Sequence, residues 1–199
     1  QINKGDFIGF KGKSGAGKST LIDLIVGILK PQSGEIIVDG VNINDCKENW
    51  RDKIGYVPQN VFLTDDTIKK NICLGLKEED IDPINLSRAV ELSELNDFIN
   101  KLPQGIDSKI GENGLQISGG QRQRIGIARA LYLNPELIIL DESLNAVDLE
   151  TENKIIKSIK KVRGVKTIIL VSHRQSTLDN CNTIYQLENK EISNFNVKK

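Results

Sequence analysis

The sequence has little that would place it in an oxidising compartment, at a metal centre or across a lipid bilayer. Its three cysteines, Cys46, Cys73 and Cys181, are far apart and odd in number, so neither a disulfide framework nor a thiolate metal site is present. This cysteine usage suits a reducing cytosol. The longest apolar runs reach only about seven residues, too few to span a bilayer, and the N-terminus has no signal-like segment. If the protein works at a membrane, the spanning part lies elsewhere.

An excess of charge of one sign is also missing. The 27 basic and 27 acidic residues cancel, so the composition indicates no nucleic-acid partner. An apolar content of 38% in 199 residues fits a globular domain with room for one small subdomain. Gln1 stands directly before an expected core strand, so we expect a fragment of a longer protein that lacks the first strands of its domain.

What the sequence does contain is a glycine-rich phosphate-binding loop. Residues 12–20 fit the pattern G-x-x-x-x-G-K-[ST] and lie between an apolar strand at 7–10 and an apolar helix at 18–29. The loop glycines, Gly12, Gly15 and Gly17, permit backbone conformations that let successive N–H groups converge on one anion. The start of the following helix adds the positive end of its dipole. Lys18 and Ser19 would meet the outer phosphates and Mg²⁺. The predicted nucleotide-binding residues in this loop are Gly12, Lys13, Ser14, Gly15, Ala16, Gly17, Lys18, Ser19 and Thr20.

Strand-like and helix-like segments alternate along much of the chain. Apolar runs typical of strands lie at 34–40, 54–57, 137–140 and 165–171, and a small terminal hairpin is expected at 183–193. This alternation predicts an α/β fold of the P-loop NTPase type, with a mostly parallel sheet core, a helical subdomain and a small β element.

The helical subdomain is assigned to 67–133, where the pattern shows helices without strands between them. The catalytic α/β core then consists of 1–66 and 134–199. The first helix of the subdomain is expected to be capped by Asp65 or Asp66.

Ligands of parallel sheets bind at the carboxyl ends of the strands. The phosphate loop, Gln59, Asp141, Glu142 and His173 are all predicted to lie at that edge. Asp141 follows four apolar residues and is a predicted Mg²⁺ ligand. Glu142 is expected to point elsewhere, because neighbouring strand residues alternate, and to orient or deprotonate an attacking water.

A second helix start carries a further anion site. The stretch 117–121, Ile-Ser-Gly-Gly-Gln, precedes Arg122 and resembles the signature motif of ABC-transporter ATPase domains, with Ile117 in place of the usual Leu. The serine caps a helix whose first turn has two glycines, so a phosphate can approach its bare N–H groups. The resemblance implies that the nucleotide is also bound by Ser118, Gly119, Gly120 and Gln121.

The resemblance covers almost the whole chain and implies roles for the residues at the predicted edge. Gln59 matches the Q-loop glutamine, expected to reach Mg²⁺ and take part in catalysis. Asp141 and Glu142 match the Walker B aspartate and the catalytic glutamate. Asp148 belongs to the family's D-loop and is an expected nucleotide contact, and His173 matches the switch histidine, expected to touch the γ-phosphate.

The family resemblance also implies a partner. Two such domains are expected to form a head-to-tail homodimer with two ATP molecules between them. Each ATP is then held by the phosphate loop of one copy and by Ser118, Gly119 and Gly120 of the other, which complete the charge stabilisation that hydrolysis needs.

Two further stretches resemble the exporter or flippase branch: 56–63, similar to the exporter Q-loop region, and 111–114, similar to the X-loop that contacts a membrane domain. We therefore expect a transmembrane domain in the same parent chain and a place at the cytoplasmic face of the membrane. An importer ATPase on a separate chain, a DNA-repair or chromosome-organising ATPase, and a translation ATPase are the alternatives. The transported substrate cannot be read from these residues.

Two further features bear on the expected strength of nucleotide binding: the adenine-stacking position and Lys13. The family's adenine-stacking aromatic residue falls before Gln1, so we expect weak ATP affinity, since such a stack contributes about 1–3 kcal/mol in analogous base stacking. Lys13 either adds positive charge beside the phosphates or points to solvent.

Overall fold

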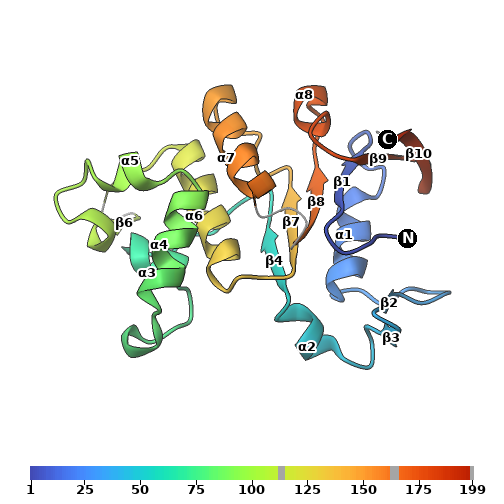
Figure 1. Ribbon diagram of the computed structural model, residues 1–199, viewed down its shortest axis with the longest axis horizontal. Helices are drawn as coiled ribbons and strands as arrows, with labels where there is room; N and C mark the ends of the chain where they lie inside the picture. The colour runs from blue at the N-terminus through green and yellow to red at the C-terminus, as the bar shows by residue number, and fades with distance from the viewer. Residues whose placement is uncertain (112–114, 162–165, 198–199) are drawn as a thin grey trace.

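The computed structural model describes residues 1–111, 115–161 and 166–197, and a six-stranded sheet forms its centre (Figure 1). The strand order is β10-β9-β1-β8-β7-β4, and every neighbouring pair is parallel except β9–β10. The predicted, mostly parallel sheet with a terminal hairpin is therefore confirmed. The strands are β1 Phe7–Lys11, β4 Ile54–Val57, β7 Leu137–Asp141, β8 Thr167–Val171, β9 Thr183–Glu188 and β10 Glu191–Val197.

Helices cover the sheet and extend beyond its β4 edge, where α3 to α6 gather (Figure 1). They are α1 Lys18–Val26, α2 Lys47–Arg51, α3 Ile68–Ile72, α4 Pro83–Leu92, α5 Asn96–Ile99, α6 Gly119–Tyr132, α7 Leu149–Lys161 and α8 Gln175–Leu178. Two 3₁₀ turns lie at Glu78–Asp80 and Gly105–Asp107. Two small antiparallel pairs complete the fold: β2 Ile37–Val38 with β3 Val41–Asn42, and β5 Asp66–Thr67 with β6 Lys109–Ile110.

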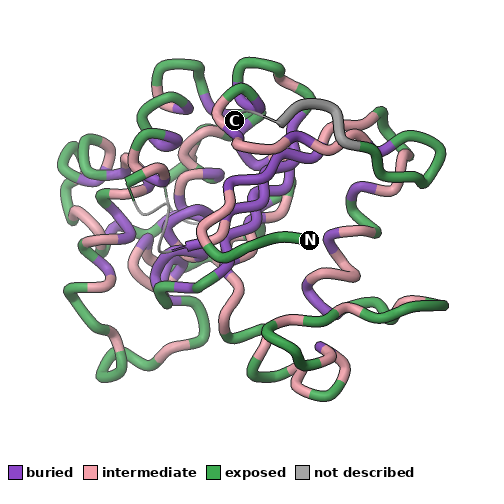
Figure 2. The backbone as a smooth tube through the Cα atoms, turned by 45° about the vertical axis from the view of Figure 1, so that its right-hand side comes forward, coloured by how far each residue is buried: buried purple, intermediate pink, exposed green. Residues whose placement is uncertain are grey.

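Apolar residues bury both faces of the sheet, which explains the continuous apolar runs of its strands. Side chains alternate along a strand, so Ile8 and Phe10 pack in one cluster with α1, whereas Phe7 packs in a second cluster on the other face. The same alternation separates Ile139 from Ile138 in β7. Figure 2 shows the buried residues concentrated along these central strands.

Three local predictions need correction. The strand expected at 34–40 is only the short β2, which pairs in a separate sheet with β3. The 67–133 region is not free of strands, because β5 and β6 pair there. The helix α3 is capped by Thr67, whose Oγ1 accepts from the Lys70 amide at 3.1 Å, and not by either preceding aspartate.

The boundary of the helical subdomain stays a prediction. One apolar cluster runs without interruption from the sheet, at Ile138 and Ile168, to α4 and α5, at Val90 and Ile99. The predicted X-loop residues Glu112, Asn113 and Gly114 lie outside the described residues.

The contact between α6 and β4 depends on a glycine. A Cβ added to Gly55 would lie 2.4 Å from the Ala130 carbonyl oxygen and 2.7 Å from Pro135 Cγ. Because a backbone atom cannot move aside as a flexible side chain can, the strand and helix approach this closely only with glycine at position 55.

We expect Gly55→Ala to lower the free energy of unfolding by about 1–3 kcal/mol, the cost of overpacking a rigid contact. Gly119→Ala, in α6, is the matched control, because the nearest atom beyond its own helix to the added Cβ would be Ala146 Cβ at 3.6 Å, an ordinary van der Waals contact. Alanine also has the higher helix propensity. Urea denaturation of both variants tests this, and equal losses would contradict it.

Candidate nucleotide-binding site

The phosphate loop joins β1 to α1 and owes its shape to its glycines. Gly15 and Gly17 have φ of 80° and 102°, the left-handed region that glycine adopts at little cost. Gly12 does not, so its predicted conformational role is wrong. It is needed for space instead, because an added Cβ would lie 2.6 Å from the Leu187 carbonyl oxygen of β9.

Lys18 lies at the first position of α1 and its side chain folds back onto the loop. It is 7% exposed, and its Nζ donates to the carbonyl oxygens of Gly12, at 2.8 Å, and Lys13, at 3.1 Å. Its Nζ also lies 3.6 Å from Glu142 Oε1. The ammonium group is therefore held at the phosphate loop, while Ser19 and Thr20 are exposed on the same helix turn.

Glu142 connects the loop to the segment after β8. Its Oε1 lies 2.7 Å from His173 Nε2, and its amide donates to the Val171 carbonyl at 3.0 Å. The backbone at Glu142 has φ of 49°, so this residue lies outside the strand pattern. Strand alternation was therefore the wrong reason for its direction: a left-handed turn aims its side chain at Lys18 and His173.

Asp141 ends β7 and meets a residue that sequence analysis overlooked. The Tyr56 hydroxyl donates to Asp141 Oδ2 at 3.3 Å. Burial raises the pKa of Asp141, and the charge of Glu142 adds to this rise, whereas the bond from Tyr56 opposes it. Burial, aided by the Asp141 charge, raises the pKa of Tyr56 to about 12, so the phenol remains a hydrogen-bond donor.

The signature residues form a separate helix start. Ser118 Oγ accepts from the Gln121 amide at 3.2 Å, and Gln121 Oε1 accepts from the Ser118 amide at 2.8 Å, which is a capping box. A Cβ on Gly120 would lie 3.2 Å from the Ala146 carbonyl oxygen, so α6 packs closely on the 142–148 loop. Among the described residues, no hydrogen bond or ion pair joins this helix start to Lys18, Glu142 or His173.

Gln59 and Asp148 are also not joined to those three residues by any hydrogen bond or ion pair in the described part of the chain. Gln59 is exposed after β4, and its carbonyl oxygen accepts from the buried Gln123 Nε2 at 2.6 Å. Asp148 Oδ1 accepts from the Thr151 amide at 2.9 Å, and this bond lowers the pKa of Asp148. In this structure the Gln59 backbone is therefore tied to α6, and the Asp148 carboxylate is bonded to the first turn of α7.

Arg174, which follows His173, bridges α7 and the loop after Glu142. Its Nη1 lies 2.6 Å from Glu152 Oε2 in α7, and its Nη2 donates to the Asn145 carbonyl at 2.8 Å. Glu152 is 2% exposed and also accepts from the Thr177 hydroxyl. Sequence analysis missed this bridge, because its members come from segments far apart in the chain.

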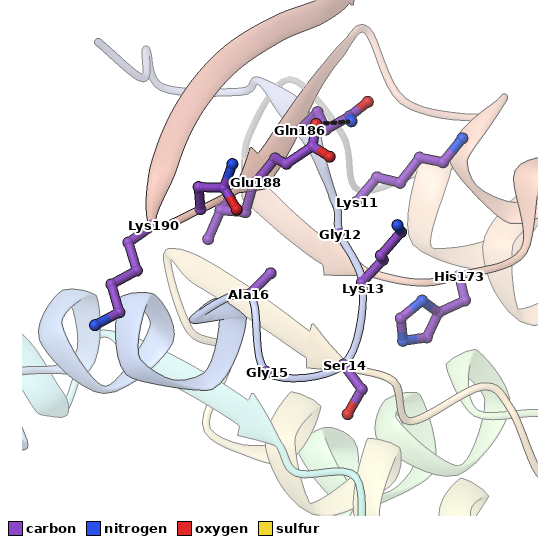
Figure 3. A pocket seen from close by; sticks show the side chains of 12 residues that line it. Lys11, Gly12, Lys13, Ser14, Gly15, Ala16, His173, Gln186, Glu188 and Lys190 are labelled. Carbon is purple, nitrogen blue, oxygen red and sulfur yellow. Dashed lines mark hydrogen bonds between the residues drawn. The ribbon is translucent and has the colours of Figure 1, made fainter.

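A cavity of about 680 Å³ lies over the loop, between residues 11–16, His173 and the hairpin residues 186–190 (Figure 3). Lys11, Lys13, Glu188 and Lys190 are the charged side chains among its lining residues, which also include His173. Lys13 is exposed and lines this cavity beside the phosphate loop.

Comparison with known proteins identifies the family of this chain. The family model described as "ABC transporter" matches residues 1–145, well over half of the chain. The chain belongs to the ABC transporter family. It is an ATPase domain of that family, and nucleotide binding follows from this membership.

Three relatives illustrate the similarity. ABC transporter B family member 21 of Arabidopsis thaliana is 39% identical over 96% of this chain and 15% of its own length. The ATP-dependent lipid A-core flippase of Ralstonia nicotianae is 37% identical over 96% of this chain and 33% of its own length. A bacterial Atm1-family ABC exporter, solved with ATP bound, has a TM-score of 0.88 and 36% identity, covering 95% of this chain and 33% of that one.

This ABC domain therefore spans a third or less of the length of these relatives. Among its described residues, no helix has the length and apolar character needed to cross a membrane.

We expect Glu152→Ala to lower the free energy of unfolding by about 2–3 kcal/mol, because it leaves Arg174 without its carboxylate. This is less than the roughly 3–5 kcal/mol typical of a broken, fully buried pair, since the Arg174 side chain is 35% exposed. Glu150→Ala removes a carboxylate from the same helix that is 81% exposed. Thermal and urea denaturation should leave this control nearly unchanged, and a similar loss in both variants would contradict the prediction.

Proposed function

We propose that this ATPase domain binds ATP with Mg²⁺ and hydrolyses it to power an ABC exporter or flippase. The observation that carries the proposal is the meeting of Lys18, Glu142 and His173 at the phosphate loop, with Glu142 Oε1 at 3.6 Å from Lys18 Nζ and 2.7 Å from His173 Nε2. A cation, a carboxylate and an imidazole at a phosphate site match the needs of phosphoryl transfer to water.

Each of these residues has a role in the proposed reaction. The loop N–H groups and the Lys18 ammonium hold the outer phosphates and offset the charge that develops on them. Glu142 accepts a proton from, or orients, the attacking water. His173 Nε2 holds Glu142 in this structure, and the imidazole lies beside the loop at the cavity. Donation to the γ-phosphate would need this N–H to turn from Glu142 to a phosphate oxygen, since a neutral imidazole has one donor.

The residues at the end of β7 fit a magnesium ion. Mg²⁺ prefers oxygen ligands and is usually bound by one or two carboxylates together with water and phosphate oxygens. Asp141 would supply the carboxylate, and Ser19 and Gln59 would supply neutral oxygens. Burial and the nearby charge of Glu142 disfavour the ionised form of Asp141, and a bound cation would relieve both effects. Mg²⁺ would there neutralise phosphate charge.

The second half of the site is proposed to come from another copy of the chain. Within the described part of one copy, no hydrogen bond or ion pair joins the helix start at Ser118, Gly119 and Gly120 to Lys18, Glu142 or His173. This helix start nevertheless presents N–H groups at the N-terminus of a 14-residue helix. A head-to-tail homodimer would bring it to the γ-phosphate of the partner, with Gln121 and Asp148 nearby. ATP then bridges the two copies, and its hydrolysis releases them.

The membrane partner is proposed from the relatives. The similar flippase and exporter are about three times longer than the part this chain matches. We infer that a transmembrane domain in the same parent chain contacts this domain at the cytoplasmic face of the membrane. In this proposal the core consists of 1–66 and 134–199, and the helical segment is 67–133. This helical segment and the Gln59 loop would transmit the nucleotide state of the core to the transmembrane domain.

We expect Glu142→Gln to keep ATP binding and to lower turnover by about 10²–10⁴-fold, the usual effect of losing a general base. It should also stabilise a dimer with ATP, because the bridging nucleotide is no longer cleaved. Phosphate release, nucleotide titration and light scattering measure the three effects. Glu136→Gln, at the other end of the same strand, is the control and should retain turnover; retained turnover in Glu142→Gln would remove this residue from the base role.

We expect a disulfide to form between Ser14→Cys of one copy and Ser118→Cys of another when a non-hydrolysable ATP analogue is present. Cys46 should first be changed to Ser, whereas Cys73 and Cys181 are buried. Each single cysteine variant serves as a control. Non-reducing electrophoresis detects the product, and failure to form it with nucleotide would contradict the head-to-tail dimer.

A further inference from the structure

Tyr56 contacts the proposed Mg²⁺ ligand from a neighbouring strand. In the parallel pairing of β4 with β7, Tyr56 lies opposite Ile139, two residues before Asp141. Its side chain reaches the end of β7, where the hydroxyl donates to Asp141 Oδ2 at 3.3 Å. Within the described residues, this is the one side-chain hydrogen bond that Asp141 receives.

The Tyr56 ring is held in place independently of that bond. It is half-buried and packs against the apolar cluster that also includes Ile139 and Ile169. A phenol has only two side-chain torsions, so a packed ring leaves its hydroxyl with little freedom. The protonated phenol therefore offers Asp141 a fixed donor.

A fixed donor matters at this position because Asp141 has few other restraints. Asp141 is 7% exposed. The charges of Glu142, Lys18 and Asp23 act on it, but none of these groups forms a hydrogen bond or ion pair with its carboxylate among the described residues. Hydrogen bonds from outer residues orient metal ligands, and their loss typically lowers metal affinity by about 10–100-fold.

We propose that Tyr56 is a positioning residue for the divalent cation, which acts by holding Asp141 Oδ2 so that the carboxylate meets the cation in one orientation. This inference rests on the proposed function, in which Asp141 binds Mg²⁺. Tyr56 does not touch the nucleotide or the reacting atoms in this scheme. Removing its hydroxyl should therefore weaken cation binding without changing the affinity for ATP in the absence of a divalent cation.

Binding of Mn²⁺, measured by electron paramagnetic resonance with a non-hydrolysable ATP analogue, tests this without relying on turnover. Tyr56→Phe keeps the ring and removes the hydroxyl. Tyr185→Phe is the matched control, because its ring stacks on Phe10 with centroids 5.7 Å apart and it lies on β9, away from Asp141. Asp141→Asn tests the proposed ligand itself.

The expected result is a dissociation constant for Mn²⁺ about tenfold higher in Tyr56→Phe, the lower end of the usual range because the 3.3 Å bond is long. Tyr185→Phe should match the parent protein. In ATPase assays, the Mg²⁺ concentration for half-maximal rate should rise with the rate at saturating Mg²⁺ retained. Replacing Tyr56 by p-aminophenylalanine, which restores a donor, should recover Mn²⁺ binding.

Two results separate the possible failures. If Asp141→Asn binds Mn²⁺ as the parent does, the proposed metal site is wrong and the inference falls with it. If Asp141→Asn loses Mn²⁺ and Tyr56→Phe binds it as tightly as the parent, the metal site stands and the inference alone is overturned. A lower denaturation midpoint for Tyr56→Phe without recovery by p-aminophenylalanine would indicate a merely structural residue and would also overturn it.

Discussion

The arrangement of the site depends on the interactions of the Glu142 carboxylate with Lys18 and His173. This carboxylate is the point where three segments that follow separate strands come together, with Lys18 after β1 and His173 after β8. These strands are neighbours in parallel register, with Val171 opposite both Phe10 and Asp141. Because parallel strands end at the same edge, the register fixes where the three side chains can meet. A shift of one residue in any strand would separate them.

The loops around Glu142 are held by contacts that span the chain. Arg174 ties the loop at Asn145 to α7, and the close approach of Gly120 to Ala146 sets the start of α6 against the same loop. Gly12 allows β9 to approach the phosphate loop from the other side. The site is therefore built on loops, but each loop is braced by a neighbouring element. Such bracing limits the reorganisation that catalysis would otherwise require.

The parts of this structure that local chemistry decides were predictable from the sequence. The strand at 137–141, the phosphate loop and the serine cap of α6 follow from apolar runs, glycine spacing and capping preferences within a few residues. The α3 cap was mistaken because four possible capping residues stand in a row at 64–67, and only the backbone geometry selects Thr67.

Contacts between distant segments could not be predicted in the same way. The bond from Tyr56 to Asp141 depends on the register of β4 against β7, and the Arg174–Glu152 pair depends on how α7 packs beside β8. The left-handed turn at Glu142 is also hidden, since glutamate rarely adopts positive φ and nothing in its residue type signals it. Roles inferred from the family resemblance fall between these cases, because they name residues without showing what each one contacts.

The signature helix illustrates how contacts refine such a role. Ser118 Oγ and Gln121 Oε1 both accept hydrogen bonds in the capping box, and the Gln121 backbone amide is used there as a donor. The box leaves the Ser118 O–H and the Gln121 side-chain NH₂ as donors, because it uses only the oxygen of each side chain as an acceptor. The first turn of α6 also offers an anion the backbone of Gly119 and Gly120, where no side chain stands in the way. The capping box therefore holds the helix start in shape without using up the side-chain donors, and the two glycines open the backbone beside them to an anion.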